Sequence, residues 1–290
     1  MFPKQTDIKM EITKNIHILK IPFLINLSPG KSIERFVNVY LITGRKIYLI
    51  DTGVKGSEQK IFEYIKSLGR NPGDIAGVFL THAHPDHIGA LKSVKKVSGC
   101  EVFVHKNEVN WVEDIDKQHN ERPVPGFYNL VEGSVSVDNV VKHNDQFNPE
   151  SGMTIKAIHT PGHSEGSVCY YFNEMKTLFT GDVIFLPGEL PIYTSYVKCI
   201  ESLKKLGREK DIKLLLSAWD NPCLGDCVNE KIEESIHYLE MIDVYISDLS
   251  SDFDPADPIS FCKKVLLKLN IPEFLANPLL LKSFISHLNI

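Results

Sequence analysis

Residues 81–87 read THAHPDH and follow directly after the apolar stretch 75–80, IAGVFL. Imidazole and carboxylate, which this short turn concentrates, are the usual protein ligands of zinc and non-haem iron. His82 and His84 are two residues apart, so on extended backbone both rings lie on the same side of the chain. Asp86 and His87 fall where a helix is predicted to begin, and they reach the same space from another direction. The turn therefore predicts a metal site at the end of a buried strand.

The bulk composition is that of a globular protein, with 43% hydrophobic and 24% charged residues in a chain of 290. This length allows one large α/β domain or two modest ones. The formal net charge of −5 gives no electrostatic attraction to nucleic acid or to anionic lipid. We therefore expect a small-molecule substrate and disfavour nucleic acid and membrane as partners.

The cysteines and the N-terminal residues point to a cytoplasmic protein. The cysteines follow no framework spacing, so we expect reduced thiols: they are Cys100, Cys169, Cys199, Cys223, Cys227 and Cys262. The first residues lack the apolar core and the cleavage site of a signal peptide. No stretch approaches the 18 or so apolar residues of a membrane span.

Hydrophobic periodicity predicts alternating strands and helices along the chain. We expect strands at 16–21, 37–42, 47–50, 75–80, 101–105, 153–158, 167–172, 178–179 and 213–216, and helices at 58–68, 86–97, near 108, 195–206, 228–247, 261–269 and 279–288. Residues 115–149 contain three prolines and are predicted to be irregular. The order of elements in both halves indicates two packed sheets with helices outside.

Three further motifs place metal-seeking residues at the ends of strands, each beside a glycine. Asp51 follows an apolar strand in LIDTG, residues 49–53, although on its own it would fit an ordinary turn equally well. His163 lies in TPGHSEGS, residues 160–167, and Asp182 ends FTGD, residues 179–182. A glycine beside each ligand lets the backbone bend sharply and approach closely. Each motif is weak alone, but their order and spacing together are a strong signal.

In these four motifs the stretch 16–220 resembles the metallo-β-lactamase superfamily, with the motif set of glyoxalase II-like metallo-hydrolases. The resemblance implies an α/β (α+β) fold, the four-layer αββα sandwich, with a one- or two-metal site where its two halves meet. We expect residues 1–227 to form this catalytic domain and residues 228–290 to be a C-terminal helical extension packed on it. Residues 248–290 are expected to cap the cleft or to mediate self-association, so a homodimer is one option.

The resemblance also implies roles for individual residues. Carried over by position, one metal is held by His82, His84 and His163, a second by Asp86 and His87, and Asp182 bridges the two. Asp51 supports these ligands from behind without binding metal. The expected cofactor is Zn²⁺, two ions per chain, with iron or manganese as alternatives.

One position departs from the family pattern. The family supplies a further histidine after a buried strand, but here Trp219 precedes Asp220 in LLLSAWD, residues 214–220. Asp220 is then a candidate ligand of the second metal. Alternatively, the second metal binds weakly or not at all, or Cys223 acts as a soft ligand. Trp219 is expected to lie behind the ligands.

The site predicts a metal-dependent hydrolase. Two divalent ions lower the pKa of a shared water so that hydroxide forms at neutral pH, and Asp86 is a candidate proton carrier. The preferred substrate is an ester, a thioester or a lactone, and no substrate-binding residue is predicted. The alternatives are a mononuclear-iron sulfur (persulfide) dioxygenase, a phosphodiesterase, and a non-catalytic metal-binding member of the fold.

Overall fold

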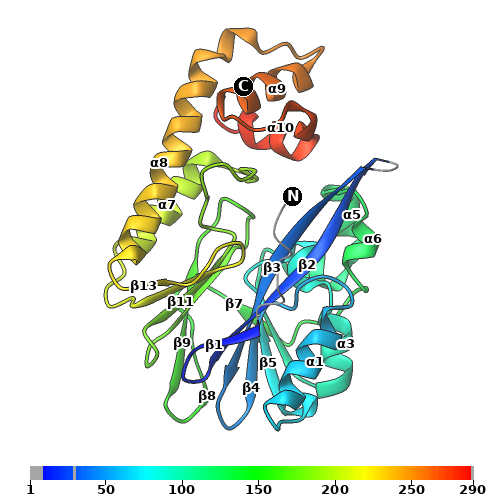
Figure 1. The fold of residues 1–290 in the computed structure, drawn as a ribbon, viewed down its shortest axis with the longest axis vertical. Helices are drawn as coiled ribbons and strands as arrows, with labels where there is room; N and C mark the ends of the chain where they lie inside the picture. The colour runs from blue at the N-terminus through cyan, green and yellow to red at the C-terminus, as the bar shows by residue number, and fades with distance from the viewer. Residues whose placement is uncertain (1–8, 29–30, 289–290) are drawn as a thin grey trace.

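Two β-sheets pack face to face in the computed structural model, which describes residues 9–28 and 31–288 (Figure 1). The first sheet has the order β1-β2-β3-β4-β5-β6-β7. Its strands are β1 (Lys9–Thr13), β2 (Ile16–Ser28), β3 (Lys31–Thr43), β4 (Ile47–Ile50), β5 (Ile75–Phe79), β6 (Glu101–His105) and β7 (Asn139–Val141). The long β2–β3 hairpin extends from this sheet toward the C-terminal helices (Figure 1).

The second sheet has the order β13-β12-β11-β10-β9-β8. Its strands are β8 (Gln146–Glu150), β9 (Met153–His159), β10 (Val168–Phe172), β11 (Thr177–Gly181), β12 (Leu214–Ser217) and β13 (Cys223–Leu224). β11 and β12 are parallel, whereas the other pairs in this sheet are antiparallel.

Alternation along the strands builds separate cores on the two faces of each sheet. In β4, Ile47 and Leu49 face the helices α1 (Ser57–Ser67) and α3 (Leu91–Ser98), while Tyr48 and Ile50 face the other sheet. Successive side chains of a strand point to opposite faces, so a strand buried on both sides is apolar at every position. The all-apolar β4 is therefore a central strand of a layered fold.

Helices cover the outer face of each sheet. On the first sheet lie α1 (Ser57–Ser67) and α3 (Leu91–Ser98), and α7 (Tyr196–Leu206) and α8 (Cys227–Asp248) cover the second (Figure 1). The remaining elements are α2 (Pro85–Ile88), α4 (Val109–Glu113), α5 (Ile115–Glu121), α6 (Phe127–Leu130), α9 (Pro258–Lys268), α10 (Pro278–Ile285) and the 3₁₀ turns η1 (Pro72–Asp74), η2 (Ser250–Asp252) and η3 (Glu273–Leu275). The predicted four-layer αββα class is confirmed.

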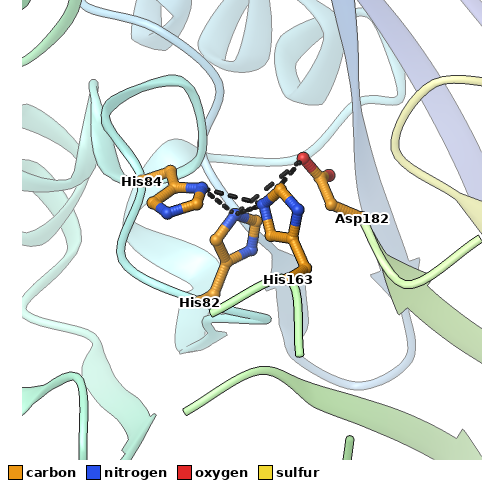
Figure 2. A group of neighbouring side chains, drawn as sticks. All are labelled: His82, His84, His163 and Asp182. Atoms are coloured by element: carbon orange, nitrogen blue, oxygen red, sulfur yellow. Dashed lines mark hydrogen bonds and ion pairs between the residues drawn. The ribbon is translucent and has the colours of Figure 1, made fainter. Parts of the chain in front are cut away.

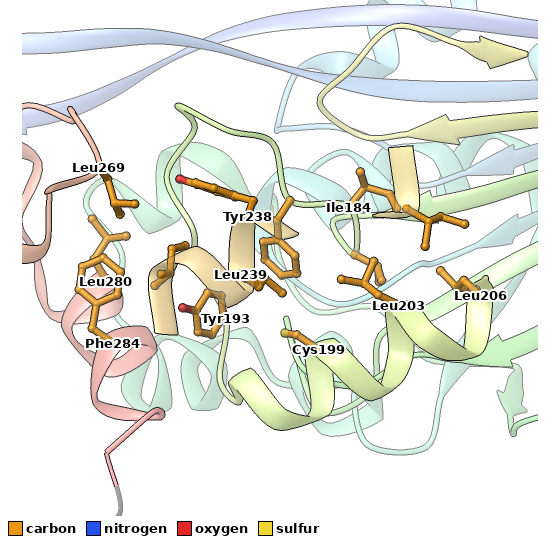
Figure 3. Close-up of a cluster of buried hydrophobic side chains, with 14 of the residues drawn as sticks. Ile184, Tyr193, Cys199, Leu203, Leu206, Tyr238, Leu239, Leu269, Leu280 and Phe284 are labelled. Carbon is orange, nitrogen blue, oxygen red and sulfur yellow. The ribbon is translucent and has the colours of Figure 1, made fainter. Parts of the chain in front are cut away.

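The C-terminal helices share one apolar core with the second sheet. Leu280 and Phe284 of α10 lie near Tyr193, and α8 contributes Tyr238 and Leu239 to the same cluster (Figure 3). All five side chains are buried. Burial of apolar surface is the main force that attaches the helical extension to the sandwich.

Two expectations about the chain are wrong. Residues 115–149 are not irregular throughout, because α5, α6, β7 and all but the last residue of β8 lie in this range. The predicted helix 86–97 is two helices, α2 and α3, because the chain bends at Gly89 and Ala90. A side chain at Gly89 would collide with backbone atoms of Val54, Lys55 and Leu130, so this bend is packed tightly against its neighbours.

The cysteine expectation also needs correction. Cys223 and Cys227 form a disulfide, with Cα atoms 5.8 Å apart, between β13 and the start of α8. Their thiols are therefore not both reduced, and Cys223 is not a thiolate ligand in this structure. The short C-x₃-C spacing gave little sign of this pair, because it depends on how β13 approaches α8. Among the described residues, no helix has the length and apolarity that crossing a bilayer requires.

Candidate metal centre

The predicted ligands lie at one edge of the two sheets. Asp51 follows β4, the turn 82–87 follows β5, and Asp182 follows β11. β4 and β5 are parallel, as are β11 and β12, so the chain leaves each pair at the same edge. The loop after β9 carries His163 and lies at this edge too, because β9 runs in the same direction as β11.

Three imidazole nitrogens and a carboxylate oxygen converge in a buried cluster (Figure 2). His84 Nδ1 lies 2.9 Å from Nε2 of both His82 and His163, and those two Nε2 atoms are 3.2 Å apart. Asp182 Oδ2 is 3.4 Å from His163 Nε2 and 3.9 Å from His82 Nε2. The four ligand atoms all lie within 4.8 Å of one another. This donor set suits one divalent ion, since zinc takes four such ligands at about 2.0–2.2 Å.

Hydrogen bonds on the far sides of two rings determine which nitrogen faces the cluster. Thr81 Oγ1 donates to Asp51 Oδ2 at 2.7 Å and therefore accepts from His82 Nδ1 at 3.1 Å. His163 Nδ1 donates to the carbonyl oxygen of Ile192 at 2.7 Å. In both rings the proton is assigned to Nδ1, so the Nε2 lone pair is directed at the cluster.

A second group of ligand atoms lies beside the first. His87 Nδ1 donates to Asp51 Oδ2 at 2.8 Å, which leaves His87 Nε2 3.1 Å from Asp182 Oδ1 and 3.8 Å from Asp86 Oδ2. His87 Nε2 and Asp182 Oδ1 are buried atoms without a hydrogen-bond partner among the described residues. Such atoms are costly, and a second cation between them would satisfy both.

The protonation of the histidines differs between the two groups. Burial lowers the pKa of His82 and His84 well below 6.5 and that of His163 to about 4, so these rings are neutral at pH 7. Burial also acts to lower the pKa of His87, but the three carboxylates around this ring outweigh it and raise the pKa well above 6.5. Without an ion His87 is protonated, and an ion at this position must displace that proton.

The two aspartates that line the second group also differ. Burial raises the pKa of Asp86. Asp182 is similarly buried, but the positive charge of His87 beside it holds its pKa below the usual range. Asp182 is therefore ionised and oriented toward both groups, while Asp86 is the carboxylate better suited to accept and release a proton.

Gly181 lets Asp182 reach the cluster. Its backbone has φ of 55°, in the left-handed region, and a Cβ at this position would lie 2.6 Å from Thr81 Oγ1. Only glycine accommodates both requirements without strain. The two sheets consequently meet closely here, where Val168 N also donates to Thr81 O at 2.8 Å.

Trp219 and Asp220 lie just after β12 and contribute no atom to the four-residue cluster. Asp220 Oδ2 pairs with Lys231 Nζ of α8 at 3.0 Å. The Trp219 ring packs against Phe23 and Phe36, with ring centroids 6.3 and 6.1 Å away. Trp219 also lines the pocket described below, so this aromatic ring is a wall of that pocket.

A buried carboxylate that the sequence analysis did not single out joins two ligand segments. Glu108 Oε2 accepts from Ala83 N at 3.0 Å, and Oε1 accepts from Ser164 Oγ and Gly166 N, both at 2.8 Å. Ala83 separates the first two histidine ligands, and Ser164 follows His163. No local pattern marks a single glutamate between a strand and a short helix, so only the contacts reveal its role.

A pocket of about 350 Å³ opens beside the cluster. His84, Asp86, His163 and Asp182 line its metal end. The rest of the wall is mostly apolar and comes from the β2–β3 hairpin, the segments 122–125 and 184–192, Trp219, and the C-terminal segment 274–279. Arg122, which the sequence analysis also did not single out, lies in this wall.

Comparison with known proteins agrees with this architecture. Residues 33–217, more than half of the chain, match the family model described as the metallo-beta-lactamase superfamily. A probable metallo-hydrolase of Bacillus subtilis is 33% identical over 150 residues, 51% of this chain and 66% of the relative. An atrochrysone carboxyl ACP thioesterase of Passalora fulva is 32% identical over 171 residues, 57% of this chain and 43% of the relative. The chain thus spans about half the length of such curated relatives.

A solved structure extends the likeness to the fold of nearly the whole chain. A metallo-beta-lactamase family protein of Thermus thermophilus superimposes with a TM-score of 0.72 at 19% identity, covering 96% of this chain and 93% of that one. The chain belongs to the metallo-beta-lactamase superfamily.

Proposed function

We propose that this superfamily member is a metal-dependent hydrolase that cleaves an ester, a thioester or a lactone. One observation carries the proposal: four buried ligand atoms from separate segments lie within 4.8 Å of one another at the end of a pocket. Few structural roles would place three neutral imidazoles and an ionised carboxylate together, because each loses hydration on burial.

A divalent ion bound in this cluster lowers the pKa of water and polarises a carbonyl. The residues of the chain supply the remaining requirements. Asp86 lies in the pocket wall, and its raised pKa suits it to take a proton from water and pass it to the leaving oxygen or sulfur. As that proton moves, the new bond from water oxygen to the carbonyl carbon replaces the bond to the leaving group.

The finer proposal is two zinc ions with unequal affinity. His82, His84 and His163 would hold the first, Asp86 and His87 the second, and Asp182 would bridge them. Support comes from His87 Nε2 and Asp182 Oδ1, which lie 3.1 Å apart and make no hydrogen bond to other described residues. Asp220 stays a candidate for the second ion, but binding there requires it to leave Lys231.

An acyl substrate is favoured by the pocket and by one relative. The mostly apolar wall suits a carbon chain better than a polyanion. The relative from Passalora fulva is named a thioesterase. A phosphodiester is less suited, because its charged group loses hydration beside a mostly apolar wall.

The test is a substrate panel on one preparation. Metal-free protein is loaded with zinc, manganese or ferrous iron, its metal content is measured, and a thioester, an aryl ester, a lactone and a phosphodiester are assayed. We expect metal-dependent turnover of the acyl substrates. Preferential cleavage of the phosphodiester, or no turnover with any metal, would contradict the proposal.

A mononuclear-iron sulfur dioxygenase is the second candidate. It is favoured because one group of ligands converges fully, whereas Asp220 is paired elsewhere. A single iron bound by two histidines and a carboxylate, with open positions for oxygen, suffices for that chemistry. One iron per chain together with oxygen consumption on a persulfide would select it over the hydrolase.

A further inference from the structure

Arg122 is the feature of the pocket that the metal centre does not explain. Its side chain lines the pocket together with His84, Asp86 and Asp182. Its backbone N–H donates to Gln118 O, but its guanidinium makes no hydrogen bond or ion pair within the described ranges 9–28 and 31–288. Arginine stays charged at neutral pH, and the only charges that act on this buried guanidinium are the nearby carboxylates of Asp86, Asp182 and Glu108, with none of which it forms an ion pair in the described part of the chain.

The chain holds Arg122 at this position by two devices. Gln118 Nε2 donates to the carbonyl oxygen of Ala83, between the two histidines of the turn, and thereby fixes α5 against the metal centre. Arg122 follows the last residue of α5, its N–H donates to Gln118 O, and its side chain lines the pocket beside the same centre. Pro123 follows and disfavours a helical backbone at Arg122, which has φ −141° and ψ 73°, so the helix ends here.

The other charges of the pocket have partners. Arg35 pairs with Glu189 at 2.6 Å. Asp182 belongs to the histidine cluster, and Asp86 lies near His87. Cations bound at the metal centre would neutralise these two aspartates. Glu108 would then be the remaining carboxylate near Arg122, and it already accepts three hydrogen bonds, which favours an anion beside the guanidinium.

The pocket also has an apolar compartment. Phe23, Phe185 and Trp219 line it, together with Leu275 and Leu279 of the C-terminal segment. A carbon chain fits such a wall, because its burial there removes apolar surface from water on both sides.

We propose that the substrate is an amphiphilic acyl ester or thioester whose carboxylate pairs with Arg122 and whose carbon chain fills the apolar compartment. The inference rests on the proposed function, since the acyl bond is placed at the metal centre. A carboxylate is favoured over a phosphate monoester for two reasons. The guanidinium fork fits either group, but the mostly apolar wall disfavours the more strongly hydrated phosphate, and one positive charge balances a monoanion but not a dianion.

The first test measures binding to metal-free protein, where no ion can attract the carboxylate. The probes are N-octanoyl-β-alanine and its neutral amide, N-octanoyl-β-alaninamide, followed by calorimetry. We expect the anionic probe to bind at least about tenfold more tightly, which is the usual size of a hydrogen bond to a charged group. Arg122→Met should remove this preference, and Arg122→Lys should restore part of it.

Arg35→Met is the matched control, because it removes the other arginine of the same pocket but one that already has a partner. It should retain the preference for the anionic probe. Equal affinities of the two probes for the unmodified protein would overturn the inference. So would a preference that survives Arg122→Met or that Arg35→Met abolishes equally.

The second test measures turnover by the zinc-loaded protein. The substrates are the octanoyl thioesters of 3-mercaptopropionate and of its neutral amide. Arg122→Met should lower the anionic-to-neutral ratio of kcat/KM about tenfold, mainly through KM. Turnover without any dependence of this ratio on Arg122 would overturn the inference and keep the proposed function. If no substrate is hydrolysed but binding of the anionic probe depends on Arg122, the recognition site is supported and the proposed hydrolase activity is overturned.

Discussion

The two ligand groups of the metal centre differ in how far hydrogen bonds fix their side chains. His82 and His163 each have their far nitrogen fixed by a hydrogen bond, and Glu108 joins the segments that carry them. In the second group, His87 Nε2 and Asp182 Oδ1 lie 3.1 Å apart as an ion pair and make no hydrogen bond to other described residues.

This difference indicates that the first ion position is formed before its ion binds, whereas the second is completed only when its ion binds. The first group consists of neutral rings that need lose no proton. The second must displace a proton from His87, and its last candidate ligand, Asp220, is held by Lys231. We therefore expect the first ion to bind much more tightly than the second.

The largest expected effect comes from removing a ligand of the first group. His84→Ala takes away the nitrogen that lies 2.9 Å from both other rings. Metal content by elemental analysis should fall below one ion per chain, and hydrolysis should fall to background. His237→Ala, at an exposed histidine of α8, is the control. Full metal content in His84→Ala would rule out this centre.

Glu108→Gln removes part of the hydrogen bonding that joins the segments carrying the first group of ligands. In the amide, an NH₂ group replaces one of the two acceptor oxygens. This donor then faces an N–H or a hydroxyl that donated to the carboxylate, so that hydrogen bond is lost. Partners behind metal ligands typically contribute about 10- to 100-fold in affinity, and we expect a loss in this range for the first ion. The control is Glu113→Gln, where the carboxylate accepts from Val137 N in an exposed contact. Equal zinc affinities in the two variants would contradict this role.

The protonation difference predicts how the stability of the metal-free protein depends on pH. The pKa of His163 is about 4 in the folded state and about 6.5 when unfolded, so its contribution to stability is present above pH 6.5 and declines as the pH falls toward 4. Between pH 7.5 and pH 5 this amounts to about 2 kcal/mol. The free energy of unfolding is measured in urea after chelation, at both pH values. Between them it should fall less in His163→Asn than in the unmodified protein, by about 2 kcal/mol. An identical pH dependence of both proteins would refute the assignment.

The smallest effect is expected at Asp220. Its carboxylate is 25% exposed and paired with Lys231, so Asp220→Ala should reduce the affinity for the second ion by less than Asp182→Ala does. Stepwise zinc titration resolves the two ions. Comparable losses in the two variants would mean that Asp220 is a full ligand of the second position.

Much of the fold was predictable because periodicity is local. The strands at β4 and β6 were predicted with the observed bounds, since each is apolar or β-branched and ends at a turn. The segment 115–149 was not, because its short elements are stabilised by contacts with distant residues. Gln118, for example, bonds to Ala83, and Glu132 accepts from Ser93.

The sequence by itself determined the fold class and placed the ligand types in tight turns, because glycine, proline and strand ends act within a few residues. Only the tertiary structure decided what surrounds them: the carboxylate of Glu108, the pairing of Asp220 with Lys231, the Cys223–Cys227 bond and the unpaired Arg122. Each of these depends on how packed sheets and helices place the side chains, and all but the disulfide, whose cysteines are four residues apart, join distant parts of the chain. Such contacts leave no periodic or local trace in the chain.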